Sequence, residues 1–428
     1  MEQKKINTRS FLELEANRME SLTFLMVSTY YPPHHLGGDA TFVSYVSREL
    51  ARRGHEVHVY YNSRAYELFR GKEQRASDAG QSDGIVKHLY HSRTARFDPV
   101  LALSLGMWGK AEAELRRVVK EVQPDVMHWH NTRGLIGRIF TVDQTKNFYT
   151  VHDYTPICPK SSLMKPGMKL CDDPRWCTTC VMSRGKPPQL WRIRGNRVIH
   201  YPNDLRIIAP SKFVAEKLRN EHVPVNHVLR GFVPDVGAGL TRVSQSGDSI
   251  MYMGLLEPHK GLMTLLDAFV RSKDSQGFKL HIIGEGSMRS SLLKRVHKLG
   301  LENRISIPGF LSNEQIAAIR GNAAAHIVPS IWYENAPAVA LEAMSCGIPV
   351  IASEIGGLPE IVTEEAGSDL FAPGNVEQLA GLIVKTWTER DNLGIRRVRA
   401  RAEYERRFKP EVHISEYLRI INEHDPGT

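Results

Sequence analysis

Short apolar segments alternate with amphipathic segments along the chain, and this alternation restricts the fold more than any other feature. In the first half, the apolar segments read "TFLMVST", "EVHVYY", "DVMHWH", "NFYTVHD" and "RIIAPS". In the second half they read "IMYMG", "KLHIIG", "RISIPG", "AHIVPS" and "IPVIAS". Helices are expected between them, at about 40–53, 264–271, 290–299, 313–320 and 337–347. Because strands that alternate with helices form parallel sheets with crossover helices, the chain is predicted to be an α/β protein.

The two series of segments predict two facing, doubly wound, Rossmann-like domains with a deep cleft between them. The stretch "VLRGFVPDVGAGLTRVSQSGDS" separates the series and has the glycine-rich and serine-rich composition of an interdomain linker. We expect a loose extension over 1–21, a first domain over 22–235, a linker over 236–248, a second domain over 249–408, and a helix over 409–428 that returns to the first domain. Ligands of such folds bind at the carboxyl ends of the strands, so the cleft is the expected site.

Composition restricts the location and the partners of the chain. No apolar run is long enough to span a bilayer, and the N-terminus lacks the apolar core of a secretory signal. The protein is therefore expected in the cytoplasm, with Met19 as an alternative start. The formal net charge of +9 fits an anionic partner, such as a nucleic acid, a lipid surface or a phosphorylated substrate, and it fits plain solubility equally well.

Two glutamates stand eight positions apart in the stretch "SIWYENAPAVALEAMSCGIPVIAS". A helix is predicted from Pro337, which suits a first helical position, to Gly347, which suits the residue past the end. Glu342 lies in the apolar middle of this helix and is expected to be buried, so it needs donors such as sugar hydroxyls, or a buried Arg or Lys. Glu334 precedes the helix and is expected at the mouth of a site, beside the partly positive helix N-terminus, unless it merely decorates a loop.

Three further motifs follow predicted strands. Gly37 and Gly38 stand between a strand and a helix, where backbone amides can approach a phosphate. Lys260, in "GLLEPHKG", can neutralise a diphosphate leaving group, or it is an ordinary surface lysine. His152 ends the strand "NFYTVHD" at the expected cleft and is a catalytic candidate or a structural histidine. Arg289 occupies the third glycine position of the dinucleotide fingerprint in "GEGSMR", which disfavours a dehydrogenase.

Taken together, "YPPHHLGGDA", "TVHDY", "GLLEPHKG" and "PSIWYENAPAVALEAMSCGIPVIASEIGGLPEIV" resemble the retaining glycosyltransferases of family 4, which have the GT-B fold. The resemblance runs from Leu22 to about Tyr417, and the Glu-x7-Glu pair is its most specific part. The resemblance implies that the donor sugar and its phosphates are held by Glu334, Asn335, Ala336 and Pro337, with the Gly37 and Gly38 amides. It also implies that Glu342 accepts the ribose hydroxyls, Lys260 stabilises the diphosphate, and His152 contacts the donor sugar.

The resemblance implies an enzyme that moves a sugar from a nucleotide diphosphate sugar to a hydroxyl of a growing, lipid-linked glycan in bacterial surface polysaccharide assembly. One departure is Leu255, which stands where many relatives carry an arginine, so that half of the usual diphosphate clamp is absent. Either another basic residue, or Lys260 together with the Gly37 and Gly38 amides, must then neutralise the diphosphate charge that the arginine would neutralise. The chain contains no Asp-x-Asp motif, so catalysis is expected to need neither a metal ion nor a cofactor. An enzyme that hydrolyses or epimerises the nucleotide sugar itself is an alternative.

Four cysteines form a cluster within an insert over 158–180. Cys158, Cys171, Cys177 and Cys180 have the spacing C-x12-C-x5-C-x2-C, which suits either a structural zinc site or reduced thiols that pack a loop. With zinc, the basic segment beside the cluster suggests a rival function, a zinc-stapled nucleic-acid-binding protein. That rival leaves the glutamate pair without a role, so no nucleic-acid partner is expected.

The same basic segment, "RGKPPQLWRIRGNR", suggests a contact with the membrane. Five basic residues without an acid, and Trp191 among them, suit an anionic lipid surface. The enzyme is therefore expected to bind reversibly at the inner face of the membrane. The alternative is a solvated loop, or one shielded by the acidic "CDDP" nearby. The five residues are Arg184, Lys186, Arg192, Arg194 and Arg197.

Overall fold

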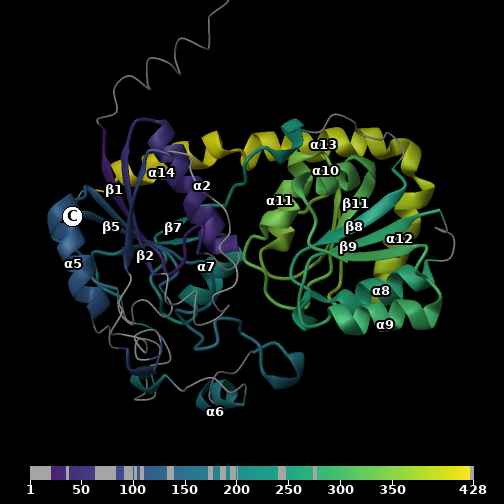
Figure 1. Ribbon diagram of the computed structural model, residues 1–428, viewed down its shortest axis with the longest axis horizontal. Coiled ribbons are helices and arrows are strands. Elements are labelled where there is room, and N and C mark those ends of the chain that lie inside the picture. The colour runs from purple at the N-terminus through teal and green to yellow at the C-terminus, as the bar shows by residue number, and fades with distance from the viewer. Residues whose placement is uncertain are drawn as a thin grey trace, which may run out of the picture.

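The chain folds into two α/β lobes that lie side by side (Figure 1). The structure is a computed structural model, and it describes residues 21–34, 38–62, 83–90, 100, 104–106, 110–132, 139–171, 177–183, 189–192, 199, 201–239, 247–272 and 277–424. The expected extension at the N-terminus and the middle of the expected linker lie outside these residues.

The first lobe is built on a parallel sheet with the strand order β3-β2-β1-β4-β5-β6-β7. Its helices include α2 (Gly38–Arg52), α5 (Lys110–Val122) and α7 (Lys212–Arg219), and the short α6 (Cys177–Met182) projects away from the sheet (Figure 1). The strands are β1 (Thr23–Val27), β2 (Glu56–Asn62), β3 (Ile85–Tyr90), β4 (Val126–Trp129), β5 (Lys146–Thr150), β6 (Arg206–Ala209) and β7 (His227–Val228).

The second lobe repeats the plan with the parallel order β10-β9-β8-β11-β12-β13. The strands are β8 (Ser249–Met253), β9 (Lys279–Ile283), β10 (Ile305–Gly309), β11 (Ala323–Val328), β12 (Val350–Ser353) and β13 (Asp369–Phe371). The helices are α8 (Leu262–Arg271), α9 (Arg289–Leu299), α10 (Asn313–Asn322), α11 (Ala338–Ser345) and α12 (Val376–Thr388). Predicted helix positions agree with these to within a few residues, and the predicted two-domain α/β class is confirmed.

Burial explains why these segments form central strands. All six residues of β11 and all four of β4 are buried, as expected when helices cover both faces of a parallel sheet. In each sheet the strand order reverses beside the first strand, between β1 and β4 and between β8 and β11. Such a reversal opens a crevice at the carboxyl ends of the strands, so the loops after these strands define where a ligand enters.

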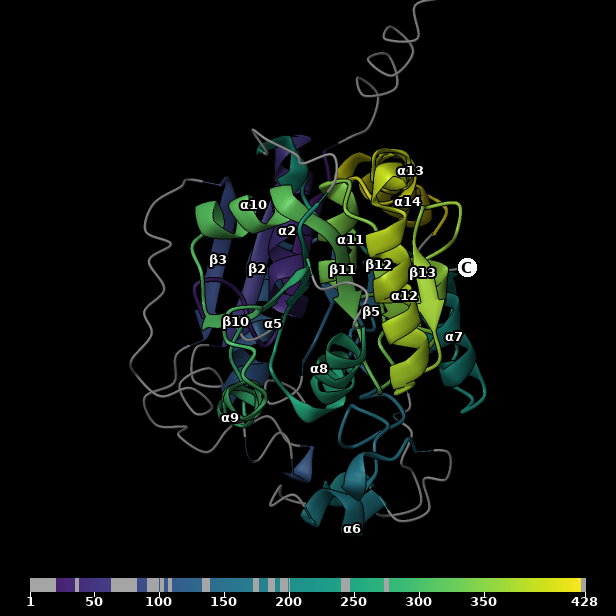
Figure 2. The ribbon, with the colours of Figure 1, turned by 90° about the vertical axis from the view of Figure 1, so that its right-hand side faces the viewer.

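The C-terminal helices connect the lobes. α13 (Leu393–Arg407) lies along the second lobe and α14 (Pro410–Asn422) along the first, and they follow one another across the top of both (Figures 1 and 2). Pro410 occupies the first turn of α14, which explains the break between the two helices. Ile414, Tyr417 and Leu418 of α14 belong to the same core cluster as Phe24 of β1. The last helix thus supplies part of the core of the first lobe.

No helix in the described ranges has both the length and the apolar character needed to cross a bilayer.

Several histidines are buried in these cores. Burial lowers the pKa of His128 and of His326 to about 3 and the pKa of His413 to about 4. Each of them is less than a tenth exposed. All three are therefore neutral in the folded protein at pH values where an unfolded histidine is already charged.

We expect the free energy of unfolding to decrease as the pH falls from about 6.5, where unfolded histidines take up protons, toward the folded-state values of about 3 to 4. In this window the unfolded state binds more protons, so each buried histidine lowers stability by about 1.4 kcal/mol per pH unit. Urea unfolding at a series of pH values measures the slope. His326→Phe should reduce the slope, whereas a change of the exposed His222 to Asn should not. Equal slopes for both variants would contradict the assignment.

Candidate active site

The candidate site residues come together where the two lobes meet. Lys260 ends a short helical turn (Pro258–Lys260) after β8, and Glu334 lies in the loop after β11. From the first lobe, His152 lies just beyond the carboxyl end of β5. These three residues, far apart in sequence, thus reach one junction from the strand ends of both sheets.

The centre of the site is an ion pair between Lys260 and Glu334. Lys260 Nζ lies 2.7 Å from Glu334 Oε1, and the Ser330 hydroxyl donates to the same oxygen at 2.5 Å. The Lys260 ammonium also lies 5.0 Å from the centre of the Trp332 ring. Burial by itself would raise the pKa of the Glu334 carboxyl, but the charge of Lys260 and the hydrogen bonds from Lys260 and Ser330 hold that pKa below its usual value. The pair is therefore ionised, and its charges stabilise each other.

Glycines bring the backbones of the site loops into direct contact. Gly261 has φ +69°, and a Cβ there would lie 1.8 Å from the Pro329 carbonyl oxygen. Gly356 has φ +63°, and its Cβ would lie 2.3 Å from the Glu334 carbonyl oxygen, which accepts a hydrogen bond from the Gly357 amide at 2.7 Å. Since no other residue fits either position without displacing backbone, the glycines hold Lys260 and Glu334 at a set separation.

The expected burial of the two glutamates was wrong. Glu334, predicted at the mouth, is 5% exposed, whereas the side chain of Glu342, predicted inside, is 22% exposed. The loop that carries Glu334 folds into the lobe junction and packs against the loops of Lys260 and Gly356, so it is covered despite its polar sequence. The predicted helix is present as α11, with Pro337 as its N-cap and Gly347 in the left-handed conformation beyond its end.

Glu342 is paired with Arg320 of α10. The guanidinium donates to Glu342 Oε2 at 2.5 Å, and Arg320 is 9% exposed. The buried arginine that the sequence left open as a partner for Glu342 is thus present. The same guanidinium lies 3.9 Å from Met253 Sδ, at the end of β8. Arg320 was not singled out from the sequence, although an arginine in the last turn of a helix, three positions before a buried strand, was a usable signal.

His152 is held from both lobes. Asn335 Nδ2 donates to the backbone oxygen of His152 at 2.5 Å, which ties the loop after β11 to the loop after β5. His130 Nδ1 and His152 Nε2 lie 2.9 Å apart, and burial lowers the pKa of His152 to about 4. His130 was not singled out either, although "HWH" places His128 and His130 on the same face of a strand.

The remaining donor-site candidates lie around this centre. Ala336 and Pro337 are half-buried at the start of α11, and Ala336 lines a small cavity at the lobe junction together with Ser211, Arg230 and Asn335. Gly38 is the first residue of α2, where an added Cβ would meet nothing within 4 Å. Gly37 lies outside the described residues. Leu255 is 50% exposed in the loop after β8.

The four cysteines of the insert are not gathered into a metal site in the part of the chain that the structure describes. All five cysteines of the chain are described, and none forms a disulfide. Among the described residues, no three His, Cys, Asp or Glu side chains are grouped to hold a metal ion. Cys180 Sγ instead lies 3.6 Å from the ammonium of the buried Lys160.

One of the five basic residues that were expected to contact the membrane is buried. Arg192 is 5% exposed, and its guanidinium donates to the carbonyls of Thr155 and Pro156 and lies 5.1 Å from the centre of the Trp191 ring. The expectation that Arg192 faces an anionic surface was wrong, because its charge is used to hold the loop that follows His152. The other four basic residues of the segment, Arg184, Lys186, Arg194 and Arg197, lie outside the described residues.

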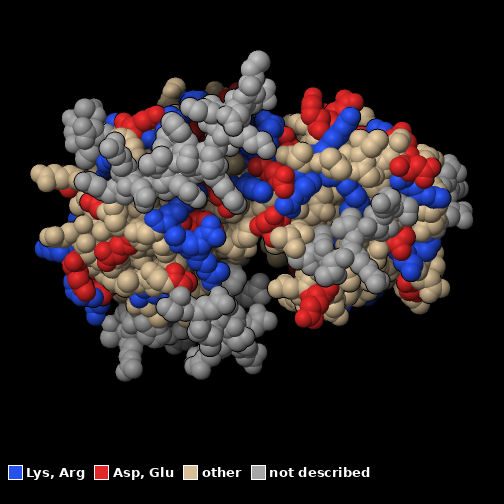
Figure 3. All heavy atoms as spheres, turned by 90° about the horizontal axis from the view of Figure 1, so that it is seen from above, with Lys and Arg blue, Asp and Glu red and all other residues tan. Residues whose placement is uncertain are grey.

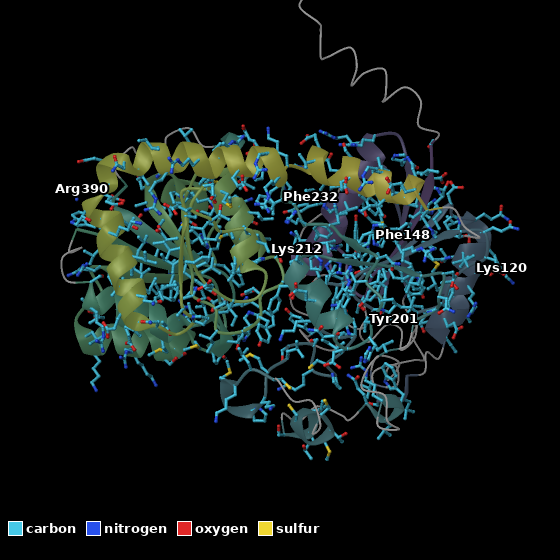
Figure 4. All side chains as sticks on the ribbon, turned by 180° about the vertical axis from the view of Figure 1, so that it is seen from behind. Lys120, Phe148, Tyr201, Lys212, Phe232 and Arg390 are labelled. Carbon is cyan, nitrogen blue, oxygen red and sulfur yellow. The ribbon has the colours of Figure 1, made fainter. Side chains whose placement is uncertain are left out.

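Further contacts set the relation between the lobes. The Glu360 carboxylate accepts from the backbone amides of Lys212 and Phe213 at 3.0 and 2.9 Å and so caps α7 across the junction. Arg401 of α13 pairs with Asp235 at 2.5 Å. Lys212 and Phe232 lie where the two lobes meet (Figure 4). The strand ends of the two sheets are thereby held facing one another.

Two lobes built on parallel sheets with these strand orders have the architecture of the GT-B fold. The profile of glycosyltransferase family 4 matches residues 36–231, and that of glycosyl transferases group 1 matches residues 243–405. Glycogen synthase of Mycobacterium tuberculosis is 32% identical over 382 residues, which cover 85% of this chain and 85% of that protein. The chain belongs to glycosyltransferase family 4.

Other relatives match over shorter stretches. The amylovoran biosynthesis glycosyltransferase AmsK of Erwinia amylovora is 26% identical over 178 residues, 40% of this chain and 44% of that protein. The chain matches the first relatives found over only 31% to 45% of their length. Among solved structures, Anabaena HepE in complex with UDP-glucose has a TM-score of 0.62 at 16% identity, over 94% of this chain and 100% of that one. At 16% identity, this structural similarity shows that the two proteins share a fold.

We expect Lys260→Met to lower the free energy of unfolding by about 3 kcal/mol, because the change leaves the buried Glu334 carboxylate without its cation. The double variant Lys260→Met/Glu334→Gln should lose clearly less, since no buried charge is left unpaired. Urea unfolding at neutral pH measures both. Equal losses for the single and the double variant would show that the pair is not coupled.

Proposed function

We propose that the enzyme transfers a sugar, with retention of its anomeric configuration, from a nucleotide diphosphate sugar to a hydroxyl of a lipid-linked glycan in cell-surface polysaccharide assembly. The observation that carries the proposal is the ion pair between Lys260 and the buried Glu334, in the loop that leads into the N-terminus of α11. A lysine and a helix N-terminus together are suited to a diphosphate, and the carboxylate beside them is suited to sugar hydroxyls.

The ion pair gives Lys260 and Glu334 complementary roles. When a diphosphate enters, Lys260 exchanges its bond to Glu334 for one to the phosphate oxygens, and Glu334 becomes free to accept from the hydroxyls of the donor sugar. As the bond to the leaving group breaks, negative charge grows on the diphosphate, and a preorganised ammonium stabilises that charge. The amides that follow Glu334, near Asn335 and Ala336, add donors at the start of α11.

His152 is neutral at physiological pH, because burial lowers its pKa to about 4. It therefore acts as a hydrogen-bonding group toward the donor sugar, without adding a charge. Lys260 supplies the positive charge that a metal ion provides elsewhere, so turnover is proposed to be independent of metal ions. With Leu255 in place of a second cation, Arg320 is a candidate to share the diphosphate charge, because its guanidinium contacts Met253 at the end of β8.

The named relatives support the choice of substrates. AmsK acts in amylovoran biosynthesis, and HepE holds UDP-glucose in a fold of the same kind. The nucleic-acid-binding rival is not favoured. Acidic and basic side chains are interspersed over both lobes on the face shown in Figure 3, and Arg192 is buried.

A panel of UDP and GDP sugars, each followed by NMR, tests the proposal. We expect one of them to be hydrolysed slowly when no acceptor is present and to be consumed faster with a lipid-linked glycan, with or without a metal chelator. Hydrolysis that no glycan accelerates would favour an enzyme acting on the nucleotide sugar itself. Absence of binding by every donor would overturn the proposal.

Glu342→Gln tests whether Glu342 binds the nucleotide of the donor found in this panel. If Glu342 binds the ribose, the loss of its charge should weaken binding of the nucleotide by about 1.5 to 3 kcal/mol, the range for hydrogen bonds to a charged group. Calorimetry measures the affinity. Glu377→Gln, at an exposed position of α12, is the control and should bind normally. An unchanged affinity in a folded Glu342→Gln protein would remove Glu342 from the nucleotide site.

We also propose a reversible contact between the 184–197 segment and an anionic membrane. Without Arg192, four basic residues remain, and each is worth about 1 kcal/mol near an anionic surface. Sedimentation with anionic vesicles should fall when Arg184, Lys186, Arg194 and Arg197 become Ser. It should not fall when the exposed Lys120, Lys294, Lys298 and Arg399 become Ser. Equal effects of the two sets would exclude a specific role for the segment.

A further inference from the structure

Three histidines from the ends of β4 and β5 form a connected group beneath the active site. The rings of His128 and His130 are stacked with centroids 4.2 Å apart, and His130 Nδ1 lies 2.9 Å from His152 Nε2. His128 and His130 are buried, whereas His152 is half-buried. His152 is thus the ring of the three that a ligand can reach, and His130 is the ring that holds it.

The inner end of this group, His128, is fixed by two hydroxyls. His128 Nδ1 lies 2.5 Å from the Tyr417 hydroxyl of α14, and His128 Nε2 lies 2.8 Å from the Thr150 hydroxyl. A hydroxyl donates or accepts as required, so both nitrogens of His128 are satisfied whichever of them carries the proton. The ring of His128 is therefore held in place, and it offers His130 a flat surface to stack on.

All three rings are neutral at physiological pH. Burial lowers the pKa of His130 well below its ordinary value, and it lowers the pKa of His152 to about 4. A neutral imidazole has one N–H donor and one bare nitrogen acceptor. In the contact between His130 Nδ1 and His152 Nε2, one ring therefore donates and the other accepts, and the choice sets the tautomer of both.

The far nitrogen of His130 decides between the two arrangements. His130 Nε2 is buried and has no hydrogen-bond partner within the described part of the chain. If His152 donated to His130, this nitrogen would carry a buried N–H without an acceptor. If His130 donates, the same nitrogen is bare, and a buried acceptor without a partner is the commoner and less costly case. The contact therefore runs from His130 Nδ1–H to His152 Nε2.

We propose that His130 is a positioning residue that holds His152 in the Nδ1–H tautomer, so that His152 meets the donor sugar as a hydrogen-bond donor and its Nε2 is not available as a base. The role of His152 toward the sugar rests on the proposed function, whereas the tautomer does not. An N–H at this position suits a sugar oxygen, and it gives a physical reason why a neutral histidine is retained there. A fixed tautomer is a way to aim one imidazole nitrogen.

Nitrogen-15 NMR of the histidine-labelled full-length protein tests the tautomer without any substrate. His152 is assigned by the signal lost in His152→Gln. We expect the wild type to show His152 protonated at Nδ1. His130→Asn should preserve this state, because the amide Nδ2–H of asparagine lies close to the position of His130 Nδ1. His130→Leu should leave His152 as a mixture of its two neutral tautomers. A wild-type His152 protonated at Nε2, or identical His152 signals in the Leu variant, would overturn the proposal.

Measurements of kcat and KM distinguish a positioning role of His130 from a purely structural one. His130→Leu should lower kcat by about 10-fold or more, because a positioned donor is lost from much of the population. KM for the acceptor should stay unchanged, and His130→Asn should restore most of kcat. His326→Phe, which removes a buried histidine from the second lobe, should leave kcat unchanged. Equal kcat for the Leu and Asn variants would overturn the positioning role. If no nucleotide sugar is turned over by the wild type, the proposed function fails, while the NMR result still decides the tautomer.

Discussion

The ion pair between Lys260 and Glu334 is the interaction on which the rest of the site depends. A carboxylate that is 5% exposed is costly unless a cation meets it, so the loops after β8 and β11 must approach until their backbones touch. The glycines at 261 and 356 permit that approach, and an added Cβ at either would collide with backbone. The same close packing places Lys260 against the loop that leads into α11. The ammonium and the carboxylate are therefore held in place by the fold itself.

The second constraint is the junction between the lobes. Asn335 holds the backbone of His152, Glu360 caps α7, and α14 completes the core of the first lobe. These contacts use backbone groups and helix ends, which have well-defined directions, so they set the orientation of the lobes as well as their separation. A site assembled from two sheets needs such contacts, because neither lobe contains both the cation and the histidine.

Sequence patterns predicted some parts of the site and misplaced others for identifiable reasons. Helix periodicity and the proline and glycine at its ends located α11 closely, because those signals are local. Periodicity says nothing about how a loop is covered, so Glu334 was expected to be exposed and is buried. A run of basic residues likewise does not reveal which of them turns inward. Arg192 does so because the carbonyls of Thr155 and Pro156 offer it acceptors.

The sequence by itself determined the two α/β lobes, the central strands, the helices α2, α8, α9, α10 and α11, and the family, because alternation, caps and the Glu-x7-Glu motif are carried by neighbouring residues. It did not predict β3, β7, β13, α5, α7 or α12. Only the tertiary structure decided which side chains of the site pair with one another. Arg320 meets Glu342 from another helix, His130 meets His152 from another strand, and Asn335 meets His152 from the other lobe. Such pairs depend on which chain segments the two sheets bring together. Burial, nearby charges and hydrogen bonds set the charge states of Glu334 and His152, and these arise only when the segments pack together.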